Sequence, residues 1–198
     1  KNIITLWNTY SFFITYASLD DFIPQDHPIE EKKLNELDYW IIAKINNFIQ
    51  IADDYYSSYE LYKLMKESSR ILDDISNWYV RRNRRRFWRS ENDDDKMSAY
   101  STLYYVLVKY IKVLSPVVPF VSDKIYENLV SNIDSFKPKS VHLTDFPKVN
   151  PNFLNEDLVE EIDCVKEIVS LGRSARNKAN LKIRQPLSEI LIYVDNNK

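Results

Sequence analysis

The residues best suited to chemistry in this sequence are the arginines and tryptophans of residues 77–90, which read NWYVRRNRRRFWRS. Placed on an α-helix, in which successive residues are about 100° apart, the segment sorts into two sides. One side carries what we call the arginine face: Trp78, Arg82, Arg85 and Arg89, flanked by Arg81 and Trp88. Val80 and Phe87 point the other way, towards a core.

This concentration of positive charge predicts an anionic ligand. Five arginines within residues 81–86 repel one another, and a bound anion would compensate for that repulsion. Guanidinium groups bind phosphate bidentately, and indole and guanidinium planes stack on bases. The RNA backbone is therefore the predicted ligand, and we count Arg86 among the candidate contacts.

A purely structural interpretation of the same arginines stays open. They could pair with acidic side chains of the chain itself, and Asp53, Asp54 and Asp73 are candidates. Arg84 leans towards the Val80 side, so we expect it to contribute to stability through packing and an acidic neighbour. Trp78 could stack on a base or close the core, and the burial tendency of tryptophan favours the core.

A second basic stretch supplies further candidate RNA contacts: Arg173, Arg176, Lys178, Lys182 and Arg184. Gly172 precedes it on an apolar helical stripe. Because glycine has no side chain, this position allows the close approach of another helix, which we favour, or of an RNA backbone. Basic residues near a helix C-terminus also complement the helix dipole, so part of this charge could be structural.

Composition excludes several classes of site. A single glycine among 198 residues excludes glycine-rich phosphate loops, and a single cysteine excludes an internal disulfide or a cysteine zinc cluster. Two isolated histidines make a metal site improbable. No apolar run approaches the roughly 20 residues needed to cross a bilayer, and no signal peptide is visible. Because Lys1 already lies in a helical pattern, we expect the chain to be part of a longer polypeptide.

The formal charge of −2 hides an asymmetry along the chain. Residues 1–60 carry 4 basic and 10 acidic groups, residues 61–90 carry 9 and 3, and residues 91–198 carry 14 and 16. The middle block, at +6, is where a polyanion would dock.

Helical periodicity dominates the elements that must position these residues. Apolar side chains recur every three or four residues around 3–17, 37–55, 61–79, 100–114, 119–129 and 155–176. Asp94 or Asp95 could cap the fourth helix, and Pro116 ends it. Pro119 suits the first turn of the fifth helix, and Asn155 could cap the sixth.

These elements predict a mainly α fold, a helical bundle with a small extended or β appendage at its C-terminal end. We expect the bundle in residues 1–150, and a long helix plus strand in 151–198. Residues 141–144 alternate as a short extended segment, and residues 190–194 read as a strand. Trp7, Trp40 and Tyr104 are assigned to the core, and Cys164 to packing between apolar positions.

Five ordered stretches resemble one known family. NWYVRRNRRRFW is similar to the arginine-rich segment in the anticodon-binding domain of isoleucyl-tRNA synthetases. LWNTYSFF (6–13) resembles the helix leaving the family's catalytic domain, and LSPVVPFVSDKIYENL (114–129) its proline-rich turn. SVHLTDFP (140–147) and LGRSARNKANLKIRQPL (171–187) also match, with Phe146 where the family more often has tryptophan. Valyl and leucyl enzymes share the bundle, but the arginine run and NLKIRQPL favour the isoleucyl branch.

The resemblance implies a cytoplasmic, monomeric enzyme in which this bundle grips the anticodon stem and loop of isoleucine tRNA. Isoleucine activation with ATP and magnesium would belong to the catalytic domain of the same polypeptide, whose HIGH-like and KMSKS-like signatures are absent here. KMSA at residues 96–99 lacks the second lysine and reads as a helix start. The chain alone is therefore expected to need no cofactor and to be catalytically silent.

Other classes of function remain to be weighed against this one. A helical protein-interaction module could use the same basic face to meet an acidic partner. An intact small enzyme is improbable, because the sequence offers no nucleophile–base pair, metal cluster or phosphate loop.

Overall fold

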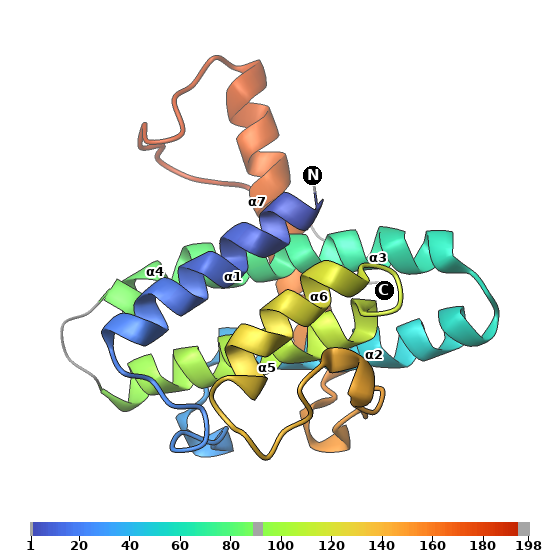
Figure 1. The fold of residues 1–198 in the computed structure, drawn as a ribbon. Helices are drawn as coiled ribbons and strands as arrows, with labels where there is room; N and C mark the ends of the chain where they lie inside the picture. Colours follow the sequence, from blue (N-terminus) through green and yellow to red (C-terminus); the bar gives the residue numbers. More distant parts are fainter. Residues whose placement is uncertain (1, 89–92, 194–198) are drawn as a thin grey trace. The chain divides into compact units, whose positions relative to one another are not determined.

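The computed structural model of the chain describes residues 2–88 and 93–193, and within these residues it contains helices and turns but no strand (Figure 1). The chain divides into two compact units, Lys1–Leu154 and Asn155–Lys198. The prediction of a mainly α helical bundle is confirmed. No helix in the described part of the chain is long and apolar enough to span a membrane.

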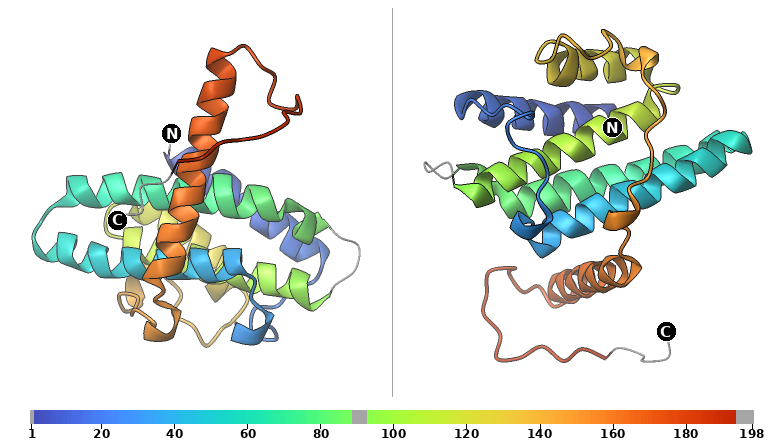
Figure 2. Two further views of the ribbon diagram at one scale, coloured as in Figure 1. Left: turned by 180° about the vertical axis from the view of Figure 1, so that it is seen from behind. Right: turned by 90° about the horizontal axis from the view of Figure 1, so that it is seen from below.

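The first unit is built around α5 (Asp94–Leu114). α1 (Asn2–Leu19) and α6 (Pro119–Tyr126, continued by a π-helical turn at Glu127–Ser131) pack against α5. α2 (Glu36–Ser57) packs on α5 away from α6, as Figure 2 shows from below. The expected helical stretches in this unit are therefore present.

The arginine segment belongs to a long helical rod in this unit. α3 (Leu61–Asp73), a π-helical segment (Asp74–Val80) and α4 (Arg81–Trp88) follow one another without a break. Figure 2 shows them running end to end beside α2. The sequence pattern predicted helix here but not the π-helical segment, in which hydrogen bonds join residue i to i+5 and the turn widens.

Helix termini follow the expected chemistry with one displacement. Pro119 lies in the first turn of α6, as predicted. α5 ends at Leu114, before Pro116, also as predicted. Its cap, however, is Asp93, whose carboxylate accepts a hydrogen bond from the backbone N–H of Lys96, so the assignment to Asp94 or Asp95 was wrong. Only Asp93 has the extended backbone that a capping residue needs.

Aromatic residues fill the core of the first unit, as expected from the composition. Its largest fully buried side chains are Trp40, Tyr79, Tyr100, Tyr110 and Tyr126. Trp40 confirms its assignment, but Tyr104 is only half-buried and Trp7 is 43% exposed. The expected core face of α1 wrongly included Trp7, because Leu6 and Tyr10 already fill the side that faces the core.

Two segments expected to be extended are not strands. Val141–Leu143 forms a 3₁₀ turn, in which the Ser140 hydroxyl accepts from the backbone N–H of His142 and Asp123 accepts from that of Val141. Such side-chain hydrogen bonds replace a ladder where no partner strand exists. Residues 190–193 carry no strand either, and Val194 lies outside the described residues.

The second unit consists of α7 (Glu156–Lys178) and the irregular segment after it. Asn155 caps α7 as predicted, accepting a hydrogen bond from the backbone N–H of Leu158 at 3.0 Å. No residue of α7 is fully buried. Cys164 is exposed, so its assignment to packing was wrong.

Candidate nucleic-acid interface

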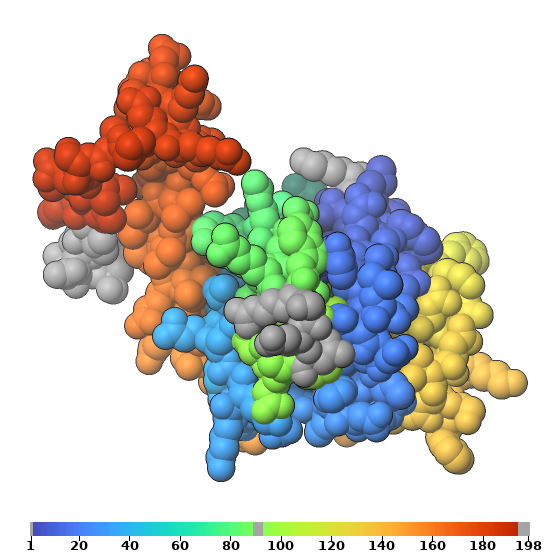
Figure 3. Space-filling model, turned by 90° about the vertical axis from the view of Figure 1, so that its left-hand side faces the viewer, coloured from blue at the N-terminus to red at the C-terminus, as the bar shows by residue number. Residues whose placement is uncertain are grey.

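The arginine face is on the surface. Arg81, Arg82 and Arg85 are exposed on α4, and Trp88 at its end is 54% exposed. Trp78, in the π-helical segment, is half-buried. It therefore lies between the two alternatives predicted for it, burial in the core and exposure to a base. Arg89 lies outside the described residues. Figure 3 shows the green surface of this helix beside the blue surface of α1.

Two guanidinium groups of α4 are held against indole rings, one in the preceding π-helical segment and one on α4 itself. The guanidinium carbon of Arg82 lies 4.2 Å from the centroid of the Trp78 ring. That of Arg84 lies 5.7 Å from the centroid of the Trp88 ring, which itself packs on Tyr16 of α1. Stacking of this kind leaves the guanidinium edges free to donate to an anion and restrains the arginine rotamers before any ligand binds.

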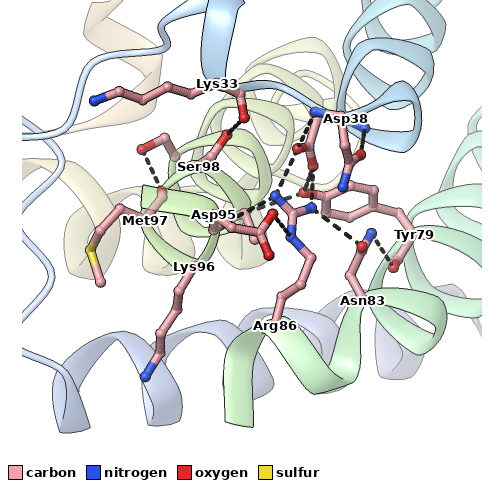
Figure 4. A network of polar contacts seen from close by, with 12 residues as sticks. Lys33, Asp38, Tyr79, Asn83, Arg86, Asp95, Lys96, Met97 and Ser98 are labelled. Atoms are coloured by element: carbon pink, nitrogen blue, oxygen red, sulfur yellow. Dashed lines mark hydrogen bonds and ion pairs between the residues drawn. The ribbon is translucent and has the colours of Figure 1, made fainter. Parts of the chain in front are cut away.

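Arg86 behaves differently, because it lies inside the unit. Only 7% of the residue is exposed, and its two terminal nitrogens each donate to an oxygen of the Asp38 carboxylate at 2.8 Å (Figure 4). Its Nε lies 2.9 Å from Oδ1 of Asp95. Burial alone would lower the pKa of this guanidinium, but the hydrogen bonds to Asp38 and the nearby acidic groups of Tyr79, Asp38 and Asp95 together outweigh burial and raise the pKa above its ordinary value. Arg86 therefore stays charged and occupied by acids of the chain.

Asp38 is the centre of this buried network. Its carboxylate also accepts from the Tyr79 hydroxyl at 2.6 Å and from the backbone N–H of Asn35 at 3.1 Å, closing the capping box of α2. Burial, followed by the nearby Asp38 charge, raises the pKa of Tyr79 well above its ordinary value, so Tyr79 remains a donor. The network joins α2 to the arginine helix.

The structure therefore corrects two assignments in the arginine segment. Arg86 was counted among the RNA contacts but is committed to an internal ion pair, whereas Arg84, expected to pair internally, is exposed. The buried face of α4 is centred on Asn83, from which Arg86 is only about 60° away around the helix and Arg84 about 100°. Because Asn83 is polar, the pattern of apolar residues alone did not predict where the buried face of α4 lies.

The acids that compensate this arginine were also missed. They are Asp38 and Asp95, not Asp53, Asp54 or Asp73. Asp73 instead accepts a hydrogen bond from the Asn77 side chain at 2.6 Å. The capping-box spacing of Asn35 and Asp38 was a sequence signal that could have placed Asp38 at the start of α2.

In the second basic stretch, Arg176 has a structural role within its own unit. Its Nη1 donates to the backbone oxygens of Lys182 and Gln185, at 3.0 and 2.8 Å, and so holds the segment that follows α7. The remaining candidates of this stretch are exposed: Arg173, Lys178, Lys182 and Arg184. Within its own unit, a Cβ at Gly172 would meet no described atom within 4 Å, and the expected close approach of a helix or an RNA backbone at this glycine stays a prediction.

Lys96 of the KMSA stretch also has a structural role. It lies in the first turn of α5, 1% exposed, with its ammonium group 2.6 Å from Asp20. Tyr100, one turn later, donates to the same carboxylate at 2.5 Å. This stretch is a helix start, as predicted. Across residues 2–88 and 93–193, no group of three or more His, Cys, Asp or Glu side chains is placed to hold a metal ion.

Comparison with known proteins identifies the family of this chain. Residues 38–191, which include the whole arginine segment, match the family model described as the anticodon-binding domain of tRNA ligase. The chain belongs to this family. The resemblance drawn from the five ordered stretches is therefore confirmed.

Its relatives of known name are much longer proteins. Isoleucine–tRNA ligase of Clostridium novyi is 46% identical over 195 residues, which cover 97% of this chain and 18% of that protein. Those of Dehalococcoides mccartyi and Clostridium tetani are 45% and 43% identical, over 97% and 98% of this chain and 19% of each relative. The chain thus spans about a fifth of the length of these ligases.

Proposed function

We propose that this chain is the tRNA-binding module of an isoleucine–tRNA ligase and that it holds the anticodon stem and loop of isoleucine tRNA. The observation that carries the proposal is the exposed side of α4, where Arg81, Arg82, Arg84 and Arg85 project beside two stacked indoles. Fixed guanidinium groups suit phosphate oxygens, and an exposed indole suits an unstacked base of a loop.

The buried network supports the same function by anchoring the inner side of α4. Because Arg86 is bound to Asp38 and Asp95, α4 is anchored through a residue that takes no part in the outer face. The outer arginines can then be fixed in place before RNA arrives, which lowers the entropic cost of binding. We assign the RNA contacts to Trp78, Arg81, Arg82, Arg84, Arg85 and Trp88, with Arg173, Lys178, Lys182 and Arg184 as a second group. Arg86 and Arg176 are left out, because each is held by partners within the chain.

The rest of the ligase reaction is assigned to other parts of the longer protein. Isoleucine, ATP and its magnesium would bind to a catalytic domain of the same polypeptide, since this chain contains one glycine and no glycine-rich phosphate loop. The parent protein would act in the cytoplasm, as a monomer. By itself, the 198-residue chain should neither form isoleucyl-adenylate nor exchange pyrophosphate.

A salt titration tests the proposal. The dissociation constant of the chain for isoleucine tRNA and for an unrelated tRNA is measured from low to moderate salt. We expect affinity to fall steeply with salt for both, because phosphate contacts release counterions, and the isoleucine tRNA to bind more tightly. Affinity that does not change with salt, or tighter binding to an acidic protein than to either tRNA, would refute an RNA-binding role.

A further inference from the structure

The π-helical segment changes which residues of the rod share a face. Successive residues are about 100° apart in an α-helix and about 80° apart in a π-helix. Twelve α-helical steps and seven π-helical steps lead from Lys66 to Arg85, which leaves these two residues about 40° apart around the axis. Nineteen α-helical steps would separate them by about 100°.

The buried side of the rod provides independent evidence for this change of phase. Ile71, Ile75, Tyr79, Asn83 and Phe87 recur every four residues, and all are buried. Over sixteen residues of ideal α-helix this spacing would rotate by about 160° and carry the last of them away from the core. One continuous buried face therefore requires the wider π-helical turns, and the opposite, exposed face is continuous for the same reason.

Basic residues of α3 lie on that exposed face. Lys66 and Arg70 are both exposed and one turn apart. By the same steps, Lys66, Arg70, Arg81 and Arg85 spread over an arc of about 120° on the exposed side of the rod, with Lys66 and Arg85 in the middle of the arc. We call these four residues the basic stripe. At 1.5 Å per residue in helix, it extends over roughly 28 Å.

The acidic side chains along the stripe are already engaged. Glu67 lies beside it and forms an ion pair with Arg70 at 3.0 Å, and Asp73 accepts from Asn77 at 2.6 Å. An ion pair this exposed contributes little, so Arg70 can exchange Glu67 for a phosphate at small cost. The stripe keeps a net positive charge with both acids counted.

We propose that the phosphate-binding surface continues from α4 onto α3, where Lys66 and Arg70 contact the backbone of double-helical RNA. The inference rests on the proposed function and deepens it, since it adds a stem-binding half to a surface whose indoles lie at the α4 end. Between Lys66 and Asn77 the stripe carries polar and charged side chains and no aromatic ring that could stack on a base. A rigid helical rod with cations along its exposed side suits the fixed backbone of a duplex, which proteins recognise by shape and phosphate position.

The test compares Lys66→Ala and Arg70→Ala with a matched control in the 198-residue chain. Lys124→Ala is that control, because Lys124 is exposed on α6 and forms the same i,i+3 ion pair, with Glu127 at 2.8 Å. The probe is a synthetic hairpin with the sequence of the isoleucine tRNA anticodon arm. Each stripe variant should weaken hairpin binding several-fold and lower the salt slope by about one unit, with an unchanged melting temperature. Lys124→Ala should change neither quantity.

Two further arms separate the possible failures. Glu67→Gln should strengthen hairpin binding, whereas an effect like that of Arg70→Ala would mean that Arg70 acts only through its ion pair and would overturn the proposal. A single-stranded RNA of equal length should bind the stripe variants and the unsubstituted chain alike, and an equal loss on both RNAs would overturn the assignment to duplex. If Arg82→Ala and Arg85→Ala weaken hairpin binding while Lys66→Ala and Arg70→Ala do not, the extension fails and the proposed function stands. If none of the four matters, the proposed function fails.

Discussion

At the scale of single residues, α4 shows one side-chain type in two roles. Five of its eight residues are arginine, yet four are exposed and one, Arg86, is buried in a network with Asp38, Asp95 and Tyr79. A guanidinium can do either because its charge is permanent and its planar fork fits a carboxylate as well as a phosphate. The available partner therefore decides the role.

Replacing Arg86 should destabilise the fold far more than replacing Arg84. Arg86→Ala leaves the fully buried Asp38 without its cation, and loss of one partner of a buried ion pair costs about 3–5 kcal/mol. Arg84→Ala removes an exposed side chain and should change the free energy of unfolding by less than about 0.5 kcal/mol. Urea denaturation of both variants measures the difference. Equal losses would contradict the assignment of these two arginines.

Tyr56 should make the stability of the chain sensitive to alkaline pH. Its hydroxyl donates to the backbone oxygen of Val113 at 2.8 Å, and burial raises the pKa of Tyr56 to about 12. The folded pKa lies above that of the unfolded chain, about 10, so this contribution is complete below pH 10 and is lost as pH rises towards 12. Tyr56→Phe should be less stable at pH 8, with the gap to the unsubstituted chain closing between pH 10 and 12 in chemical denaturation. A gap that is constant over this range would refute the linkage.

At the scale of the helices, caps and turns determine where the arginines are presented. Asn35 starts α2 with a capping box whose second member is Asp38. The Asp38 carboxylate therefore both caps the N-terminus of α2 and binds Arg86. The π-helical segment then sets the rotation of α4 relative to α3. The capping box thus sets where α2 begins, and the π-helical segment sets the direction in which the side chains of α4 point.

Replacing the capping residue Asn35 should lower the free energy of unfolding by an amount that depends on the new residue. Its side chain accepts a hydrogen bond from the backbone N–H of Asp38 at 2.9 Å. Asn35→Ala should lower the free energy of unfolding by about 1 kcal/mol, and Asn35→Gly by only a few tenths, because glycine leaves the helix end open to water. Thermal melts of the two variants measure the order. A larger cost for glycine than for alanine would show that Asn35 acts through something other than capping.

At the scale of the whole molecule, stability is concentrated in the first unit. The buried side chains of the described residues all lie between Leu6 and Phe153, and α7 contributes none. Burial of apolar surface is the dominant favourable term in folding. The unit Asn155–Lys198 therefore contains a capped helix without a core of its own.

Truncation tests this division. A chain ending at Leu154 should unfold cooperatively, with a melting temperature that changes by less than about 4 °C, roughly the shift that 1 kcal/mol produces. A peptide of residues 155–198 should show only partial helicity and no cooperative melt, since isolated helices are marginal in water. Circular dichroism measures both. Loss of the cooperative transition in the shorter chain would show that the first unit depends on the second.

The sequence by itself determined the helical class, most helix boundaries and the exposed position of the arginine face. These follow from local physics: the 3.6-residue period of apolar side chains, the backbone limits of Pro116 and Pro119, and the capping chemistry of Asn155. The ordered stretches around the arginine run also indicated the family that the comparison then confirmed. Each of these signals depends on residues close together in the chain.

Only the tertiary structure decided the role of each arginine. Arg84 and Arg86 are alike in the sequence, but Asp38, 48 residues before Arg86, is what takes Arg86 into the interior. The π-helical segment depends in the same way on the core packed against it, because the buried row from Ile71 to Phe87 must face one set of neighbours. Partners distant in sequence meet only in the fold, and a period read along one helix contains no information about them.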